Sequence, residues 1–367
     1  MADNSRVTIG IVGQLPPPHH GSAVMTQRLA QAISDIGYEA RVVSRDFSSS
    51  ADEVGQFKLQ KLRRAIGLMR EVGALGSTRA CVVFGTNRRG SFLIDCVILA
   101  ILRKKRVRTI NYIHTQGYKQ LAESSRTLAK LVKWFLAQPE LNIVLSPRLA
   151  QDIRPWVEER RIAIIPNCVA PSNGDIELDD QDASCTREVL FLSNLLPEKG
   201  ALAFVQSAAY IGPEVKVRLT VAGDTEELSY KARLYGAARS HPVSFVGSVY
   251  GAEKDSLMRR SHLFVFPTTY RYEAQPLVIL EALAAGLPVI SSDAGGIPDI
   301  IEDGVNGRIL SDVGPEEIAR AILDVLQDSG KLNVMRQSAK RSAVDRYSFA
   351  AYVKNWRRVL TSLVGEP

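Results

Sequence analysis

The stretch that decides the fold runs from Arg271 to Leu310 and reads RYEAQPLVILEALAAGLPVISSDAGGIPDIIEDGVNGRIL. It holds two glutamates, Glu273 and Glu281, with seven residues between them. Pro276 suits the first turn of a helix, where its missing N–H is not needed. The spacing therefore predicts that Glu273 lies in the loop before a helix and that Glu281 lies inside that helix.

The residues that follow predict where this helix ends. Gly286 fits the left-handed cap after a helix, and Pro288 prevents the helix from resuming. The apolar run LPVIS is typical of a buried strand. A further strand, turn and helix are expected around Gly295 and Gly296, so the stretch belongs to an alternating α/β fold.

Two carboxylates beside a helix N-terminus suit one kind of ligand. They can accept hydrogen bonds from sugar hydroxyls, while the unpaired N–H groups of the first turn donate to phosphate or sugar oxygens. This is chemistry suited to a nucleotide sugar. On spacing alone an alternative stays open, in which Glu273 complements the helix dipole and Glu281 is a surface residue.

The segment EAQPLVILEALAAGLPVISSDAGGIPDII resembles the E-x7-E signature of retaining glycosyltransferases of family 4, whose usual form is EGFGLxxLEAMAxGxPVIxxxxGGxxEII. The register is intact from Glu273 to Gly307, and the likeness covers most of the chain. In that family the first glutamate contacts hydroxyls of the donor sugar and the second holds the ribose hydroxyls. The resemblance implies these roles for Glu273 and Glu281.

Two loop positions depart from the family pattern. Ala274 replaces the first loop glycine and Pro276 replaces the second. Pro276 offers no N–H, so donor contacts from this loop are expected from Gln275, Leu277 and their neighbours. The resemblance therefore supports the type of reaction more strongly than it supports the identity of the donor.

Length and composition bound the class of protein. The chain has 367 residues, 46% hydrophobic and 23% charged, which predicts a globular protein of two domains. The four cysteines lack the spacing of a zinc or redox site and no leader peptide is recognised, so free thiols in the cytoplasm are expected. The most apolar run, Phe92 to Leu102, is too short for a bilayer span and predicts a buried helix.

Positive charge gathers in the first half of the chain. Residues 1–170 carry 25 Lys and Arg against 13 Asp and Glu, while residues 171–367 carry 21 against 26. Two clusters dominate, one at 58–70 with interleaved apolar residues and one at 103–108. An anionic membrane surface or an anionic acceptor fits this pattern, and so does a solvated helix face with packed aliphatic stems. Nucleic acid is not expected, because no recognised binding motif accompanies the charge.

Strands and helices alternate in both halves, which predicts parallel, doubly wound α/β sheets. The expected strands are VTIGIVG, EARVVS, ACVVFGT, RTINYIHT, LNIVLS and IAIIPN in the first half, and REVLFLSN, KVRLTVAGD, VSFVG, HLFVFPT and LPVISS in the second.

The polar, acidic segment at 169–187 has the composition of an exposed linker. We therefore predict a first Rossmann-like domain over 1–170, a linker over 171–186 and a second Rossmann-like domain over 187–347. The resemblance implies the GT-B fold, in which two such domains face each other across a cleft. It also implies that a last helix, within 348–367, returns to the first domain.

The first predicted strand runs through GQLPPPHHGSA into a helix. Gly21 allows close backbone approach, and the helix start offers N–H groups to an anion, although such turns often only connect strand to helix. The resemblance implies that Gly21 is the second of a glycine pair near the donor phosphate. His20 occupies the place of the first glycine, and His19 and His20 are assigned to the acceptor side.

His114 stands at the carboxyl end of the RTINYIHT strand. Its position matches a histidine that lines the donor sugar in many members of the family. A neutral imidazole can orient one sugar hydroxyl or stabilise charge at the reacting carbon. A lone histidine after a strand is more often structural, but with the E-x7-E match we predict a catalytic role.

The segment LLPEKGA resembles the family's GRLxPEKG, in which Arg and Lys bind the donor diphosphate. Lys199 matches that lysine, and Asn194 stands where the arginine usually stands. An ammonium beside a helix start supplies charge as the leaving diphosphate becomes more negative. PEKG alone would also fit a solvent-facing lysine. The predicted catalytic residues are thus His114, Lys199 and Glu273.

Three further strand ends are weaker candidates. Gly223 with Asp224, and Gly247 to Val249, follow predicted strands where relatives hold the nucleobase. The motif at 180–182 superficially resembles an Asp-x-Asp metal site but falls in the predicted linker. No metal and no cofactor are expected.

The resemblance therefore implies a retaining hexosyltransferase that uses a nucleotide diphosphate sugar. UDP-hexose is favoured as the donor from family frequency, followed by GDP-mannose. The expected acceptor is a lipid-linked or surface-polysaccharide precursor, which would place a cytoplasmic protein on the inner face of the membrane. Two alternatives stay open: a nucleotide-sugar 2-epimerase of the same architecture, and a non-catalytic nucleotide-sugar-binding protein.

Overall fold

The computed structural model describes residues 7–17, 21–45, 57–170, 186–212 and 215–367, with the side chains of 57–62 excepted. His19, His20, Asp180 and nearly all of the predicted linker lie outside this range.

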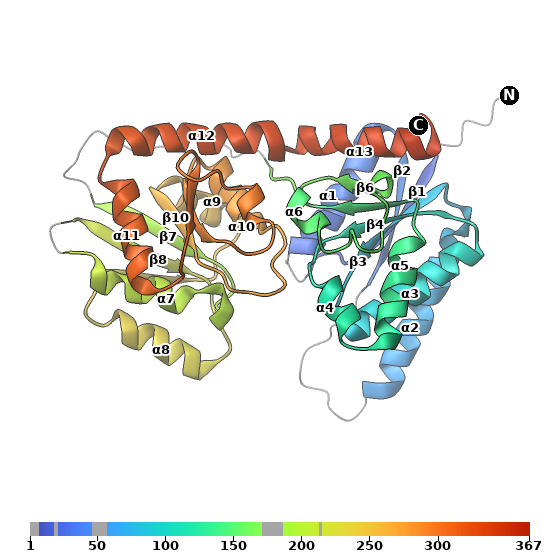
Figure 1. Ribbon diagram of the computed structural model, residues 1–367, viewed down its shortest axis with the longest axis horizontal. Coiled ribbons are helices and arrows are strands. Elements are labelled where there is room, and N and C mark those ends of the chain that lie inside the picture. Colours follow the sequence, from blue (N-terminus) through green and yellow to red (C-terminus); the bar gives the residue numbers. More distant parts are fainter. Residues whose placement is uncertain (1–6, 18–20, 46–56, 171–185, 213–214) are drawn as a thin grey trace. The chain divides into compact units, whose positions relative to one another are not determined.

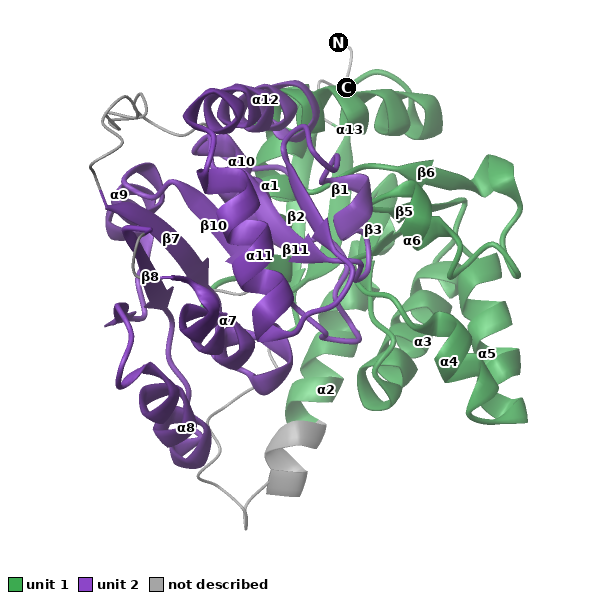
Figure 2. Cartoon of the chain, turned by 60° about the vertical axis from the view of Figure 1, so that its left-hand side comes forward, with its two compact units in different colours: residues 1–167, 349–367 green, residues 168–348 purple. Residues whose placement is uncertain are grey.

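The chain forms two compact units, coloured green and purple in Figure 2. The first comprises residues 1–167 and 349–367, and the second comprises residues 168–348.

The first unit is built on a parallel sheet of six strands in the order β2-β1-β3-β4-β5-β6. The strands are β1 (Thr8–Gly13), β2 (Glu39–Ser44), β3 (Ala80–Gly85), β4 (Arg108–Ile113), β5 (Leu141–Val144) and β6 (Ile162–Ile164). The helices are α1 (Gly21–Ile36), α2 (Phe57–Ala74), η1 (Leu75–Ser77), α3 (Arg89–Lys104), α4 (Tyr118–Glu123), α5 (Arg126–Ala137), α6 (Pro147–Ala150), η2 (Glu159–Arg161) and α13 (Phe349–Val364).

Helices cover both faces of this sheet, as Figure 1 shows. The last helix, α13, packs against α1, and α2 packs against α3. Trp356 of α13 is fully buried, and its ring meets the edge of Tyr112 from β4 at 5.2 Å between centroids. A segment from the end of the sequence thus completes the core of the first unit.

The apolar run from Phe92 to Leu102 lies within α3, as predicted, but it is not buried all round. Leu93 and Val97 are 47% and 48% exposed, whereas Ile98 faces the core. The run is therefore an amphipathic helix. Among the described residues no helix is both long and apolar enough to cross a bilayer.

The second unit is built on another parallel sheet of six strands, in the order β12-β11-β10-β7-β8-β9. The strands are β7 (Arg187–Leu192), β8 (Val217–Ala222), β9 (Val243–Gly247), β10 (Leu263–Phe266), β11 (Val289–Ser292) and β12 (Gly307–Leu310). The helices are η3 (Pro197–Lys199), α7 (Ala201–Ser207), η4 (Ala208–Tyr210), α8 (Leu228–Ala238), α9 (Gly251–Arg259), α10 (Leu277–Ala284), η5 (Ile297–Asp299), α11 (Pro315–Leu326) and α12 (Ser329–Tyr347).

The stretch from Arg271 to Leu310 folds largely as expected. Pro276 is the N-cap of α10 and not part of its first turn, so the helix starts at Leu277. Gly286 has φ +74°, the left-handed conformation predicted for the cap. The element after Gly296 is a single 3-10 turn, η5, and not the predicted helix. The N–H of Glu302 and the carbonyl of Ile300, which a longer helix would use, are hydrogen-bonded to the side chain of Asn306 instead.

The fold class predicted from the sequence is confirmed: two doubly wound parallel sheets with helices on their faces. In each sheet the strand order reverses once, between β1 and β3 and between β7 and β10. Open α/β sheets bind ligands at such points, outside the carboxyl ends of the strands. The loops after β7 and β10 are therefore the first places to search for a site.

Candidate functional site

Lys199 and Glu273 meet where the second sheet reverses its strand order. Lys199 follows β7 and Glu273 follows β10, and these strands are neighbours in the sheet. The distance between Lys199 Nζ and Glu273 Oε2 is 2.6 Å, and the two side chains are 14% and 10% exposed. Thr268 Oγ1 donates a second hydrogen bond to the same carboxylate oxygen at 3.2 Å. A short, nearly buried ion pair thus occupies the point where ligands bind in such sheets.

Aromatic rings hold the ammonium of Lys199 from another side. Its Nζ lies 4.4 Å from the centroid of the Tyr270 ring and 5.5 Å from that of Phe266, within the range of cation–π attraction. Gly200, with φ +88°, brings this loop against the next, because a Cβ there would lie 2.4 Å from the carbonyl oxygen of Pro267. Two loops distant in sequence are therefore locked together around one positive charge.

A second glycine fixes the backbone of Glu273. Gly295 has φ +54°, and a Cβ there would stand 2.1 Å from the carbonyl oxygen of Glu273. Gly296 N donates to the carbonyl of Ala274 at 2.7 Å. Ala274 and Gln275 are buried at 5% and 6% exposure, so this loop is packed down on the unit. Its geometry is set by the GG turn after β11.

Glu281 lies eight residues after Glu273, and a different lysine pairs with it. It sits inside α10, largely buried, and the Nζ of Lys254 from α9 lies 2.7 Å from its Oε1. Each side chain is 23% exposed. The two glutamates of the motif are therefore held by two different lysines.

The loops that follow the remaining strands of the second unit contact one another through their backbones. Gly223, after β8, has φ +134°, and a Cβ there would lie 1.9 Å from the carbonyl oxygen of Ser193. Its N–H donates to the carbonyl of Gly247 at 2.7 Å. Val249 is buried at 6% exposure, whereas the side chain of Asn194 is exposed. Residues expected around the nucleobase thus lie at the same edge of the sheet as Lys199.

His114 belongs to the first unit and directly follows β4. Its ring stacks on Phe84 at 4.9 Å and meets the edge of Tyr112 at 4.1 Å between centroids. Burial lowers the pKa of His114 to about 3, so the imidazole is neutral near pH 7. Its Nε2 is enclosed and has no hydrogen-bond partner among the residues that the structure describes. Gly21, also in this unit, is the exposed first residue of α1.

Part of the second basic cluster has a structural use. Arg103 and Lys104 lie in the last turn of α3, where positive charge complements the helix dipole. Arg103 also donates to the side chain of Gln138, and Arg108 donates to the carbonyl of Leu363 in α13. These arginines therefore help to hold the first unit together. The first cluster, on α2, has exposed arginines at 63, 64 and 70.

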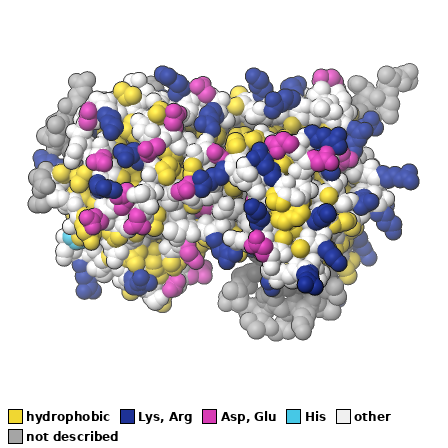
Figure 3. All heavy atoms as spheres, viewed as in Figure 1, with side chains coloured by type: hydrophobic (Ala, Val, Ile, Leu, Met, Phe, Trp, Pro, Cys, Tyr) yellow, Lys and Arg dark blue, Asp and Glu magenta, His cyan; other side chains and the backbone are white. Residues whose placement is uncertain are grey.

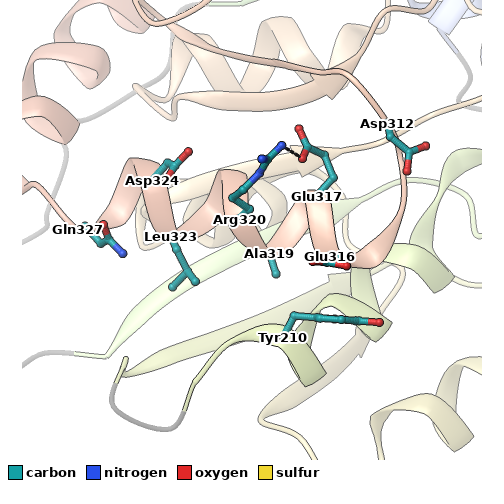
Figure 4. A pocket seen from close by; sticks show the side chains of 9 residues that line it. All are labelled: Tyr210, Asp312, Glu316, Glu317, Ala319, Arg320, Leu323, Asp324 and Gln327. Atoms are coloured by element: carbon teal, nitrogen blue, oxygen red, sulfur yellow. Dashed lines mark hydrogen bonds and ion pairs between the residues drawn. The ribbon is translucent and has the colours of Figure 1, made fainter.

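A cavity of about 550 Å³ lies on α11, and Figure 4 shows its lining. Four of the lining residues are carboxylates: Asp312, Glu316, Glu317 and Asp324. Arg320 is paired with Glu317. The cavity contains none of the predicted site residues, and its excess of negative charge would repel a phosphate. It is not the site for a nucleotide.

Three side chains beside the glutamates were not predicted from the sequence: Thr268, Tyr270 and Lys254. The first two lie between β10 and Glu273, so their place in a strand-end loop was a usable signal. Lys254 had none, because its pairing with Glu281 joins two helices 27 residues apart. Among the described residues there is no group of three or more His, Cys, Asp or Glu that could hold a metal ion.

Comparison with family models gives two matches that together span most of the chain. Residues 19–173 match the model described as Glycosyltransferase Family 4, and residues 181–342 match the model described as Glycosyl transferases group 1. The boundary between the two matches falls within the linker predicted over 171–186.

Individual relatives match about half of this chain. An uncharacterized glycosyltransferase of Methanocaldococcus jannaschii is 29% identical over 202 residues, which cover 52% of this chain and 51% of the relative. A phosphatidyl-myo-inositol mannosyltransferase of Mycobacterium tuberculosis is 28% identical over 186 residues, 49% of this chain and 48% of the relative. The chain thus spans about half the length of the curated relatives it matches.

Solved structures match over nearly the whole chain. The crystal structure of Anabaena HepE in complex with UDP has a TM-score of 0.77 at 19% identity, with 97% of this chain and all of that chain covered. At this identity the likeness shows the fold alone. The two sheets and their helices are therefore those of the GT-B glycosyltransferase structures.

Proposed function

Because this chain belongs to the group 1 and family 4 glycosyltransferases, we propose that it transfers a hexosyl unit from a nucleotide diphosphate sugar to an acceptor hydroxyl. One observation carries the proposal: the Lys199–Glu273 pair at the point where the second sheet reverses its strand order. The pair offers a cation for a diphosphate and a carboxylate for sugar hydroxyls within a single contact. That combination matches the two ends of a sugar diphosphate.

In this proposal Lys199 stabilises the leaving group. As the bond to the sugar breaks, the diphosphate gains negative charge, and a fixed ammonium then attracts it more strongly than it attracts the intact donor. In the structure, Glu273 neutralises that ammonium at 2.6 Å. Binding of the donor would release part of this attraction, so that Lys199 turns to the phosphate and Glu273 turns to the sugar hydroxyls.

The rest of the donor is assigned along the same edge of the sheet. Glu281 would bind the ribose hydroxyls, and the backbones of Gly223, Gly247 and Val249 would bind the base. Gly223 and Gly247 stand at strand ends and are hydrogen-bonded to each other. UDP-hexose is our leading donor and GDP-mannose the next. HepE was crystallised with UDP, and a mannosyltransferase is among the relatives, which supports testing both.

We propose retention of the anomeric configuration on the strength of the E-x7-E resemblance. The acceptor hydroxyl would attack from the face that the leaving phosphate vacates, and that phosphate would accept the proton. The glutamates then bind and orient the donor and do not act as acid and nucleophile. His114, neutral because burial lowers its pKa, can only accept or donate a hydrogen bond, which fits orientation of a hydroxyl.

The acceptor we propose is held at a membrane, as a lipid-linked or surface-polysaccharide precursor. On the first unit, Ile66 of α2 is 46% exposed beside exposed arginines, and the neighbouring α3 exposes Leu93 and Val97. In the right-hand part of Figure 3, Lys and Arg side chains lie around hydrophobic ones. Apolar side chains ringed by basic ones suit an anionic lipid surface.

The test of the reaction is product analysis with purified protein. UDP-hexoses and GDP-mannose are first screened for thermal stabilisation, which reaches about 2.7 kcal/mol when the ligand stands at a hundred times its Kd. The stabilising donor is then incubated with and without an acceptor lipid extract. We expect a glycosylated lipid and free nucleoside diphosphate only when acceptor is present.

Each other outcome counts against the proposal in its own way. Conversion of the donor sugar without acceptor would identify an epimerase. Stabilisation by donor with no product, together with cellular glycan formation that is unchanged by Lys199→Ala and by Glu273→Ala, would identify a binding protein. Lys331→Ala, an exposed lysine of α12, is the matched control and should leave transfer unchanged.

Flotation with liposomes tests the acceptor side separately. We expect the protein to rise with vesicles that contain anionic phospholipid and to stay behind with neutral ones, and the binding should weaken as salt is raised. Replacing Leu93 and Val97 together with Gln should reduce flotation. Equal recovery with neutral and anionic vesicles would contradict the membrane-held acceptor and leave the transfer reaction unaffected.

A further inference from the structure

Glu281 is an isolated charge in an apolar helix. The eight residues of α10 read LVILEALA, so all of them except Glu281 are apolar. Ile279, Leu280, Ala282 and Leu283 are buried. A carboxylate that is three-quarters buried in such a helix needs a partner, since an unpaired buried charge is costly. Its partner is Lys254, at 2.7 Å.

Lys254 is in an unfavourable place for its own helix. It lies near the start of α9, where the helix dipole disfavours positive charge. Glu253 beside it, in the first turn, has the sign that the dipole prefers. The helix therefore gives no reason for a lysine at this position, whereas the contact with Glu281 does.

The pair also leaves one oxygen of the carboxylate unused. Lys254 binds Oε1, and among the described residues no other group donates to the carboxylate of Glu281. α9 begins four residues after the end of β9, and Lys254 lies in its first turns, on the chain segment that follows Gly247 and Val249. One oxygen of Glu281 is thus fixed by a lysine of α9, while the other can accept a hydrogen bond.

We infer that Lys254 is a positioning residue for donor binding, which holds Glu281 in the orientation that receives the ribose hydroxyls. The inference rests on the proposed function. A glutamate has three rotatable side-chain bonds, and fixing one oxygen before the ligand arrives removes much of the ordering cost from the binding step. Specificity for ribose over deoxyribose then depends on a lysine that does not contact the sugar.

Calorimetric titration with nucleoside diphosphates tests this directly. UDP and GDP are compared on the wild-type protein, and the tighter one is then compared with its 2′-deoxy analogue. We expect the wild type to prefer the ribonucleotide by about tenfold, as one hydrogen bond to a charged acceptor provides. Lys254→Met should weaken the ribonucleotide by about fivefold to tenfold and leave the deoxynucleotide nearly unchanged.

Two further variants calibrate the result. Glu281→Gln removes the acceptor charge and sets the largest loss of preference, and Lys254→Arg keeps a cation beside Glu281 and should restore most of it. Lys331→Met, far along the chain in α12, controls for loss of a lysine.

A purely structural salt bridge would give a different pattern. Lys254→Met would then weaken both nucleotides equally or neither, and either result overturns the inference while nucleotide binding itself stands. If the wild type binds no nucleoside diphosphate, the proposed function fails and this inference falls with it.

Discussion

Each unit of the molecule contains a nearly buried ion pair beside the point where its sheet reverses strand order, and the two pairs differ in one respect. In the first unit, Asp95 of α3 is fully buried and pairs with Arg45, which follows β2, at 2.5 Å. Its other oxygen accepts from both the N–H and the hydroxyl of Thr86. In the second unit, Glu273 receives Lys199 and Thr268 on one oxygen only.

We propose that this difference separates a structural pair from a binding pair. Both oxygens of Asp95 are engaged within the unit, and Arg45 also donates to the carbonyl of Phe84 at 2.8 Å. Nothing is left for a ligand. The second pair is slightly exposed, and the other carboxylate oxygen has no donor among the described residues. We propose that a substrate can replace the protein partner there.

The largest expected effect is on the closed pair. Asp95→Ala leaves Arg45 buried without its carboxylate, which should lower the free energy of unfolding by about 3–5 kcal/mol. Urea denaturation of the purified variant measures this. The control is Glu159→Ala, which breaks the exposed pair with Arg154 and should cost under about 1 kcal/mol. Equal losses for the two variants would erase the distinction between the pairs.

The open pair should respond in activity. Lys199→Ala removes the cation proposed for the leaving diphosphate, and we expect kcat/KM for transfer to fall at least about a hundredfold, ~2.7 kcal/mol of transition-state stabilisation. The urea midpoint should move much less than for Asp95→Ala. Steady-state kinetics and denaturation of the same preparation measure both. A variant that transfers sugar normally but unfolds easily would place Lys199 with the structural pair.

The glycine behind the open pair offers a sharper test. Gly295→Ala places a Cβ against the carbonyl oxygen of Glu273 at a positive φ, and should cost about 1–3 kcal/mol of stability while weakening donor binding. Gly236→Ala in α8 is the control. Nothing lies within 4 Å of its added Cβ, so it should stabilise the helix by up to about 1 kcal/mol. If donor affinity is unchanged in Gly295→Ala, the glycine turn plays no part in donor binding.

The smallest effect concerns His114 and pH. Its pKa in the folded state is lowered to about 3, so between pH 6.5 and 3 the unfolded chain binds a proton that the folded chain does not. Stability is therefore lost as the pH falls. From pH 7 to pH 5 this amounts to about 1–2 kcal/mol.

Comparison with His114→Gln isolates the effect. The variant should lose less stability than the wild type between these pH values in urea denaturation. Burial raises the pKa of Asp95 to about 6, which acts in the opposite direction, but both proteins share that group. Parallel pH profiles for the two proteins would show that the imidazole is not protected from protonation.

Much of the fold was readable from the sequence, and the reasons are local. Gly286 and Pro288 mark the end of α10, and the apolar runs after them predict strands because strands buried on both faces need continuous apolar side chains. The short strand β12 was missed, since GRIL follows a turn with no alternation to reveal it. The exposed Leu93 and Val97 were missed because an apolar composition does not show which face of a helix is covered.

The site was predictable only as far as its residues follow strands. Lys199 and Glu273 could be expected together because both loops leave the carboxyl edge of one sheet. Their 2.6 Å contact, and the pairing of Glu281 with Lys254, depend on side-chain directions across separate elements. Those directions are set by tertiary packing, which no spacing in the sequence records.

The last helix has a consequence for synthesis on the ribosome. α13 fills the core of the first unit with Trp356, yet it is translated after all of residues 168–348. At ordinary elongation rates that delay is about ten to forty seconds. We expect the nascent first unit to expose the apolar surface beside Tyr112 during this interval, and therefore to bind chaperones until α13 has been translated.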